Sequence, residues 1–77
     1  MKPLLDVLTS LHPDRDYAGS SDYLADGLID SFDMMRLITL IEQEYGVQVT
    51  GTDLMPQNFS SLENLRQLLV GYGVKDI

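Results

Sequence analysis

Cysteine is absent from this chain, and its absence excludes two classes of site. Without thiols, neither a disulfide framework nor a thiolate metal site can form, and a small fold that lacks disulfides suits the reducing cytoplasm. No apolar run approaches the roughly 18 residues that are needed to span a bilayer. Residues 1–16 also lack the small-residue cleavage site of a signal peptide. We therefore expect a cytoplasmic protein.

Basic residues are scarce as well. Five lysines and arginines stand against twelve acidic residues, for a formal net charge of -7. The field of such a chain repels phosphate backbones and anionic lipid, and it attracts basic protein surfaces. Nucleic-acid binding and membrane insertion are therefore not expected. The same acidic excess also serves solubility, which requires no partner.

A chain of 77 residues has too little material for a second core. A domain of this size buries only about 60% of the surface that its unfolded chain exposes. An active-site cleft of ~300 Å³ is then difficult to line with side chains. We expect a single domain over residues 1–77, a monomer, and no enzymatic activity of the chain on its own.

The chain does contain clear helical periodicity. Residues 3–12 are predicted to form a first helix, which Pro13 terminates. Residues 13–30 form a long connection rich in Asp, Gly and Ser, and loops of this length are usually functional. A second helix extends from Phe32 until Gly46 ends it. Its apolar stripe consists of Met34, Leu37, Ile38, Ile41 and Tyr45.

The helical signal is weaker after the second helix and then resumes. Residues 52–55 are predicted to form a short helical turn ended by Pro56. Ser60 and Glu63 have the spacing of a capping box that opens a last helix. The fold class expected is all-α, a small four-helix-type bundle of three main helices plus a short one, with a long loop between the first and second helices. The apolar face of the last helix consists of Leu62, Leu65, Leu68 and Leu69.

The start of the second helix, DGLIDSFDMM at residues 26–35, offers two candidate N-caps. With Asp30 as the cap, Asp33 falls at position N3, and both carboxylates face the first-turn amides. Ser31 is then the first helical residue, and its hydroxyl is free. With Ser31 as the cap, Met34 falls at N3 and no reciprocal box forms. The first arrangement is favoured, and it leaves a hydroxyl where a helix N-terminus stabilises an attached phosphate.

Nucleophilic catalysis by Ser31 itself is disfavoured. A serine hydroxyl needs a base within hydrogen-bond reach, and the single histidine, His12, is expected at the far end of another helix. No G-x-S-x-G turn surrounds the serine either. From the residues alone, Ser31 is a capping or surface residue, or the substrate of another enzyme.

The segments DGLIDSFDMMRLITLIEQEYGVQV and DLMPQNFSSLENLRQLL resemble the acyl and peptidyl carrier proteins, over residues 22–70. That family shares a helical bundle with a long first loop and an Asp-Ser-Leu motif that opens the second helix. The resemblance matches Asp30 to the aspartate, Ser31 to the modified serine, and Phe32 to the leucine. It implies that 4′-phosphopantetheine, taken from coenzyme A, is attached covalently to Ser31.

The resemblance also implies the function. An acyl or aminoacyl carrier protein holds its cargo as a thioester on the phosphopantetheine arm, presents it to partner enzymes, and catalyses nothing itself. The partners implied are a phosphopantetheinyl transferase, a loading ligase, and acyltransfer or condensing enzymes. Such carriers serve fatty acid, polyketide and nonribosomal peptide biosynthesis. Members in fatty acid synthesis tend to have an acidic residue at the position of Arg36, so the arginine favours a specialised biosynthetic pathway.

Helical spacing also predicts a partner-binding surface beside the serine. Met35 lies at i+4 from Ser31, and both Met35 and Phe32 lie off the core stripe, so we expect them at or near the surface. The predicted partner-binding residues are Asp30, Phe32, Asp33, Met35 and Arg36.

Other residues admit plainer interpretations. Met34 and Met55 are expected to fill the core. Glu42, Glu44 and Asp53 either extend an acidic docking strip or simply face solvent. The alternative to a carrier protein is an unmodified acidic helical interaction module, in which Ser31 is only a cap.

Overall fold

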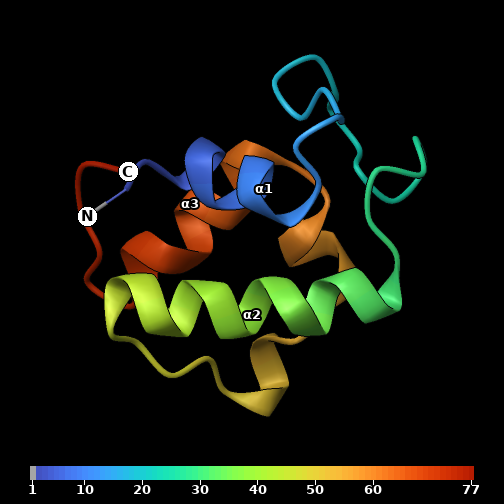
Figure 1. Cartoon of the computed structure of the whole chain (residues 1–77). Coiled ribbons are helices and arrows are strands. Elements are labelled where there is room, and N and C mark those ends of the chain that lie inside the picture. Colours follow the sequence, from blue (N-terminus) through green and yellow to red (C-terminus); the bar gives the residue numbers. More distant parts are fainter. Residues whose placement is uncertain (1) are drawn as a thin grey trace.

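The computed structural model describes residues 2–77, and they form an all-helical fold (Figure 1). The elements are α1 (Leu4–Leu11), α2 (Ser31–Tyr45), η1 (Gly51–Asp53), η2 (Pro56–Phe59) and α3 (Leu62–Gly71), of which η1 and η2 are 3-10 helices. No strand occurs among residues 2–77. The predicted all-α bundle of three main helices, with a long loop between the first two, is confirmed.

The short elements differ from the sequence prediction. The turn predicted at residues 52–55 is η1, which begins one residue earlier. A second 3-10 helix, η2, begins at Pro56, the residue that was predicted only to end a turn. Proline is well suited to the first position of a helix, because its missing N–H would have no partner there.

The last helix also starts differently from the prediction. The N-cap of α3 is Ser61, whose side chain accepts a hydrogen bond from the backbone N–H of Asn64 at 3.1 Å. The predicted cap, Ser60, instead accepts a hydrogen bond from the Tyr23 N–H at its carbonyl oxygen. The predicted capping box with Glu63 is therefore wrong. Sequence spacing could not separate two adjacent serines. Ser60 ends η2 with a helical backbone and donates its hydroxyl to the Gln57 carbonyl, whereas Ser61 has the extended backbone of an N-cap.

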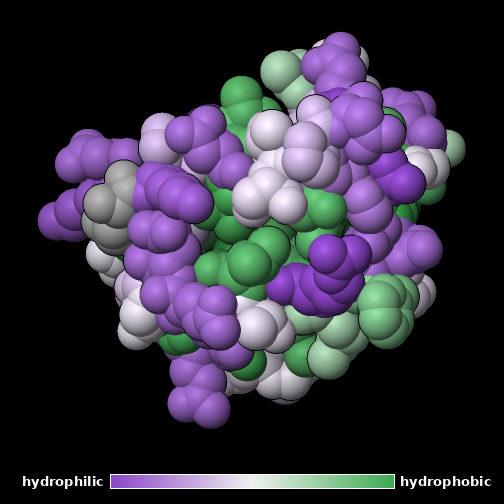
Figure 2. Space-filling view, in the orientation of Figure 1, coloured by the Kyte–Doolittle hydropathy of each residue, from purple (hydrophilic) through white to green (hydrophobic). Residues whose placement is uncertain are grey.

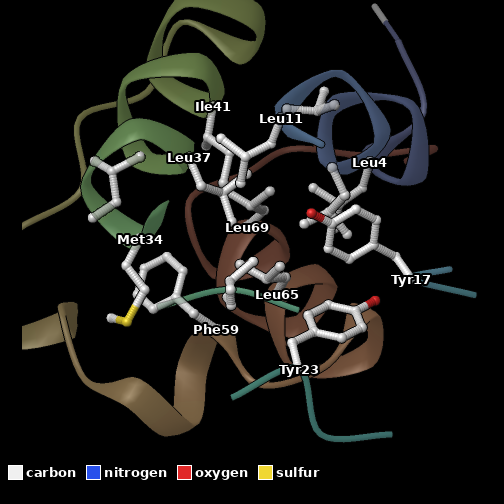
Figure 3. Close-up of a cluster of buried hydrophobic side chains, with 14 of the residues drawn as sticks. Leu4, Leu11, Tyr17, Tyr23, Met34, Leu37, Ile41, Phe59, Leu65 and Leu69 are labelled. Atoms are coloured by element: carbon white, nitrogen blue, oxygen red, sulfur yellow. The ribbon is translucent and has the colours of Figure 1, made fainter. Parts of the chain in front are cut away.

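The core lies between the three α-helices, because α1 packs against both α2 and α3 (Figure 1). Met34 is buried in it as expected, but Met55 is 44% exposed, so the prediction that Met55 fills the core is wrong. None of the helices within residues 2–77 is both long enough and apolar enough to cross a membrane. Figure 3 shows the cluster, which includes Leu4, Leu11, Leu37, Ile41, Phe59, Leu65 and Leu69.

The long loop of residues 12–30 is fastened to this core. Tyr17 and Tyr23 are almost completely buried, and their rings meet edge to face with centroids 5.3 Å apart (Figure 3). The carbonyl oxygen of Tyr23 accepts hydrogen bonds from the N–H groups of Leu28 and Ile29, at 2.8 and 3.3 Å. Gly27 makes this tight turn possible, since its φ of 73° lies in the left-handed region. The loop therefore delivers the chain to the start of α2 in a defined geometry.

The hydroxyl of Tyr17 is buried and has no hydrogen-bond partner among residues 2–77. Burial also raises the pKa of this hydroxyl, an effect that the nearby Arg15 charge partly offsets. A buried polar group without a partner costs about 1–3 kcal/mol of stability. Burial of the Tyr17 ring therefore stabilises the fold, whereas burial of its unpaired hydroxyl destabilises it.

We expect Tyr17→Phe to raise the free energy of unfolding by about 1 kcal/mol, because it removes the unpaired hydroxyl and keeps the ring. Denaturant unfolding of both proteins measures the difference. Tyr72→Phe is the matched control, because the Tyr72 hydroxyl donates to Asp53 and its loss should destabilise the protein by about 1 kcal/mol. A Tyr17→Phe variant less stable than the wild type would contradict an unpaired hydroxyl.

Candidate functional site

The N-terminus of α2 is closed by a reciprocal pair of aspartates. Asp30 is the N-cap, and its Oδ1 accepts a hydrogen bond from the Asp33 N–H at 2.8 Å. In return, Oδ2 of Asp33 accepts a hydrogen bond from the Asp30 N–H at 3.3 Å. This capping box is the arrangement that the sequence favoured, and it is confirmed.

The capping box leaves the Ser31 hydroxyl free. Ser31 is the first residue of α2 and is exposed to solvent. Its side chain takes part in none of the hydrogen bonds found between residues 2 and 77, because Asp30 provides the cap. The amides of the first turn and the positive end of the helix dipole favour negative charge at this position. A phosphate on this hydroxyl therefore fits the site, without displacing a structural contact.

Two large apolar side chains lie beside the serine at the surface, as predicted. Phe32 is 73% exposed and Met35 is 59% exposed. Figure 2 shows hydrophobic atoms on the surface over the first turns of α2, next to hydrophilic ones. Asp30 and Arg36 are exposed in the same stretch of chain. The apolar pair and these two charged residues therefore form an accessible surface next to the Ser31 hydroxyl.

Asp33 does not belong to that surface, and the prediction that it forms part of the charged rim is wrong. Asp33 is only 6% exposed. Its Oδ1 lies 2.9 Å from Nε2 of His12 and 3.7 Å from Nη1 of Arg36, and its Oδ2 lies 3.7 Å from Nη1 of Arg15. We call these four residues, His12, Arg15, Asp33 and Arg36, the Asp33 cluster. The sequence did contain a signal for its burial, since Asp33 lies four residues before the buried Leu37, on the same face of the helix.

His12 lies at the end of the first helix, as predicted, but it is nearer to the start of α2 than that placement suggested. It is the C-cap residue of α1, and the fold brings that end of α1 against the start of α2. The imidazole nevertheless bonds to Asp33, two residues beyond the serine, rather than to the Ser31 hydroxyl. Sequence reasoning missed this neighbour because the contact depends on how α1 and α2 pack.

The ionisation of Asp33 follows from its surroundings. Burial raises the pKa of Asp33, but the hydrogen bonds from the His12 side chain and the Asp30 backbone lower it. The charges of His12 and Arg15 lower it further, so the pKa lies below its ordinary value of 3.8. Asp33 is therefore a carboxylate at neutral pH, and the cluster joins the end of α1, the long loop and the start of α2 by charge and hydrogen bonds.

The Ser31 hydroxyl has no hydrogen-bonded base among residues 2–77. Within residues 2–77, neither the histidine nor any carboxylate is hydrogen-bonded to the Ser31 hydroxyl, so a general base would have to come from elsewhere. The same residues contain no group of three or more His, Asp or Glu side chains that could hold a metal ion. The arrangement suits a hydroxyl that receives a group from another enzyme.

Comparison with known families agrees with this description. A family model described as "phosphopantetheine attachment site" matches residues 8–69, a span that includes the second half of α1, the long loop, all of α2 and most of α3. No curated protein and no solved structure matches the chain.

The Asp33 cluster should make a measurable contribution to stability. We expect Asp33→Ala to lower the free energy of unfolding at neutral pH by about 2–4 kcal/mol, because the Asp30 N–H, His12 and Arg15 lose a buried acceptor. Denaturant unfolding measures the loss. Asp14→Ala is the control, since Asp14 is exposed, and its effect should stay within about 0.5 kcal/mol.

The same pair of proteins gives a pH test. Because the pKa of Asp33 is lower in the folded state, its stabilising effect is fully present above the unfolded value of 3.8 and is lost as the pH falls through the lower folded value. The stability difference between wild type and Asp33→Ala should therefore shrink below about pH 4. A difference that stays constant down to pH 3 would show that the Asp33 charge does not stabilise the fold.

Proposed function

The chain belongs to the phosphopantetheine attachment-site family, and we propose that Ser31 is the residue that carries its 4′-phosphopantetheine. Members of the family hold this group covalently, so the protein is a phosphopantetheine-carrying carrier protein. The observation that supports Ser31 is its exposed hydroxyl at the first position of α2, left free because Asp30 caps the helix. The attachment site lies inside the matched span.

The other serines of the matched span fit the role less well. Four of them, Ser10, Ser20, Ser60 and Ser61, use their hydroxyls in local hydrogen bonds at 2.6 to 3.1 Å. Ser21 lies inside the long loop, away from any helix start. Only Ser31 combines exposure, an unbonded hydroxyl among residues 2–77, and a helix N-terminus.

The attachment reaction is a phosphoryl-type transfer from coenzyme A. The Ser31 oxygen forms a bond to the phosphorus next to pantetheine, the phosphoanhydride bond of coenzyme A breaks, and the nucleotide half leaves with the bond electrons. The serine proton passes to a base of the transferase, because no base of residues 2–77 bonds to the hydroxyl. This chain contributes a preformed helix start that favours the added negative charge.

The attached arm supplies the thiol that the cysteine-free chain lacks, and the thiol holds an acyl or aminoacyl cargo as a thioester. Carrier domains of this family are generally non-catalytic. The long arm presents its cargo at a high effective concentration to an enzyme docked on the carrier. We propose a specialised biosynthetic pathway over bulk fatty acid synthesis, on the basis of the basic residue Arg36.

The surface next to Ser31 is proposed to dock the transferase and the enzymes that load and use the cargo. Phe32 and Met35 form its apolar centre, and Asp30 and Arg36 supply charge at its edge. Apolar side chains at the centre of an interface provide most of the affinity, whereas charges at the rim set orientation and association rate. Asp33 is no longer part of this proposal, since its carboxylate is buried.

We expect wild-type protein incubated with coenzyme A and a phosphopantetheinyl transferase to gain the mass of one phosphopantetheine group, and Ser31→Ala to gain none. Intact mass spectrometry measures both, and thermal melts check that the variant stays folded. Because Asp30 remains the cap, the substitution should change stability by no more than about 0.5 kcal/mol. Modification of Ser31→Ala, or no modification of the wild type by several transferases, would refute the assignment. The second result would favour the unmodified interaction module.

The docking surface is tested by two substitutions with matched controls. Met35→Ala should weaken transferase binding about fivefold to tenfold at every salt concentration, since it removes an apolar contact. Arg36→Gln should change the association rate mainly at low ionic strength, where charges are least screened. The controls are Val70→Ala and Arg66→Gln on α3, which remove an exposed apolar side chain and a half-exposed charge elsewhere. Equal effects of variants and controls would exclude this surface.

A further inference from the structure

Arg15 connects three parts of the chain that meet at the start of α2. It lies in the long loop, three residues beyond His12, the C-cap of α1. Its Nη1 donates a hydrogen bond to the carbonyl oxygen of Leu28 and lies 3.7 Å from Oδ2 of Asp33. Leu28 stands two residues before the N-cap Asp30, so Arg15 fixes the last turn of the loop as well as the first turn of the helix.

His12 acts on the same carboxylate from the other side. Its Nε2 lies 2.9 Å from Oδ1 of Asp33, and its side chain is 24% exposed. Oδ2 of Asp33 accepts the backbone N–H of Asp30. The buried Asp33 carboxylate thus contacts His12 at the end of α1 and Arg15 in the loop. It also accepts the N–H of Asp30, the residue immediately before Ser31. Ser31 lies between the two members of the capping box, so its backbone is fixed on both sides although its side chain is free.

We propose that His12 and Arg15 are positioning residues for the modification of Ser31. His12 and Arg15 bind the Asp33 carboxylate, and Arg15 also binds the Leu28 carbonyl at the end of the loop. These contacts fix the position of the Ser31 hydroxyl when a transferase docks on Phe32 and Met35. Neither side chain bonds to the hydroxyl, so both act through Asp33 and Leu28. This inference rests on the proposed attachment at Ser31 and adds the α1 end and the loop to the site.

The physical basis is the sensitivity of group transfer to geometry. A displacement of about 1 Å in a reacting atom can cost up to a hundredfold in rate. Loss of the His12 and Arg15 contacts would leave the exposed docking side chains in place but would let the first turn of α2 sample more positions. Such a change lowers kcat and leaves KM nearly unchanged, because binding is retained while fewer docked complexes are in a reactive geometry.

The test measures transferase kinetics on the unmodified chain of residues 1–77, with coenzyme A, well below the melting temperature of each variant. We expect Arg15→Leu and His12→Ala each to lower kcat about tenfold, with KM within about twofold of wild type. Arg15→Lys and His12→Gln, which retain a donor, should restore most of the rate. Arg66→Leu is the matched control, because Arg66 is also a half-exposed arginine paired with one carboxylate, Glu63 at 3.3 Å, but on α3.

Amide hydrogen exchange of the same unmodified proteins gives a readout apart from activity. In Arg15→Leu and His12→Ala, faster exchange is expected at the first-turn amides of α2 and not in α3. The inference is overturned if both variants keep the wild-type kcat, if only KM rises, or if Arg66→Leu slows the reaction equally. These outcomes leave attachment intact as long as Ser31→Ala stays unmodified. Modification of Ser31→Ala would instead refute the proposed function itself.

Discussion

The contacts of the buried Asp33 carboxylate join the end of α1, the long loop and the start of α2, where the proposed attachment site lies. The carboxylate is buried in a small chain of net charge -7, where an unpaired negative charge would be costly. Two of the three arginines and the single histidine lie within 4 Å of it, together with the backbone N–H of Asp30. A chain with few basic residues thus places most of its arginines around one acid, at the point where the end of α1, the loop and the start of α2 meet.

At the start of α2, the residues that fix the backbone are different from the residues that are accessible to solvent. Asp30 and Asp33, on either side of Ser31, make the capping hydrogen bonds, and Asp33 also makes the ion pairs. The Ser31 hydroxyl makes no hydrogen bond among residues 2–77, so it is available. The exposed Phe32 and Met35 are likewise not needed for the core, which α2 supplies through Met34, Leu37 and Ile41 on its other face. One helix therefore packs against the core with one face and leaves the other, which carries Phe32 and Met35, open to solvent.

The parts of the fold that could be predicted from the sequence are those determined by neighbouring residues. The stripe of α2 and the choice of Asp30 over Ser31 as its cap follow from helical spacing and capping chemistry within a few residues. The burial of Asp33 and the position of His12 could not be obtained in that way, because both depend on how α1 packs against α2. The cap of α3 was predicted one residue early because η2 was not foreseen: Ser60 ends that helix, and Ser61 then caps α3.

The edge-to-face pair of Tyr17 and Tyr23 has a consequence for spectroscopy. The chain contains four tyrosines and no tryptophan, so tyrosine absorption and fluorescence are not masked by a stronger chromophore. Two of the four rings are those that fasten the long loop to the core, held 5.3 Å apart in an asymmetric environment. Near-ultraviolet circular dichroism of the unlabelled protein therefore reports directly on whether this loop is docked.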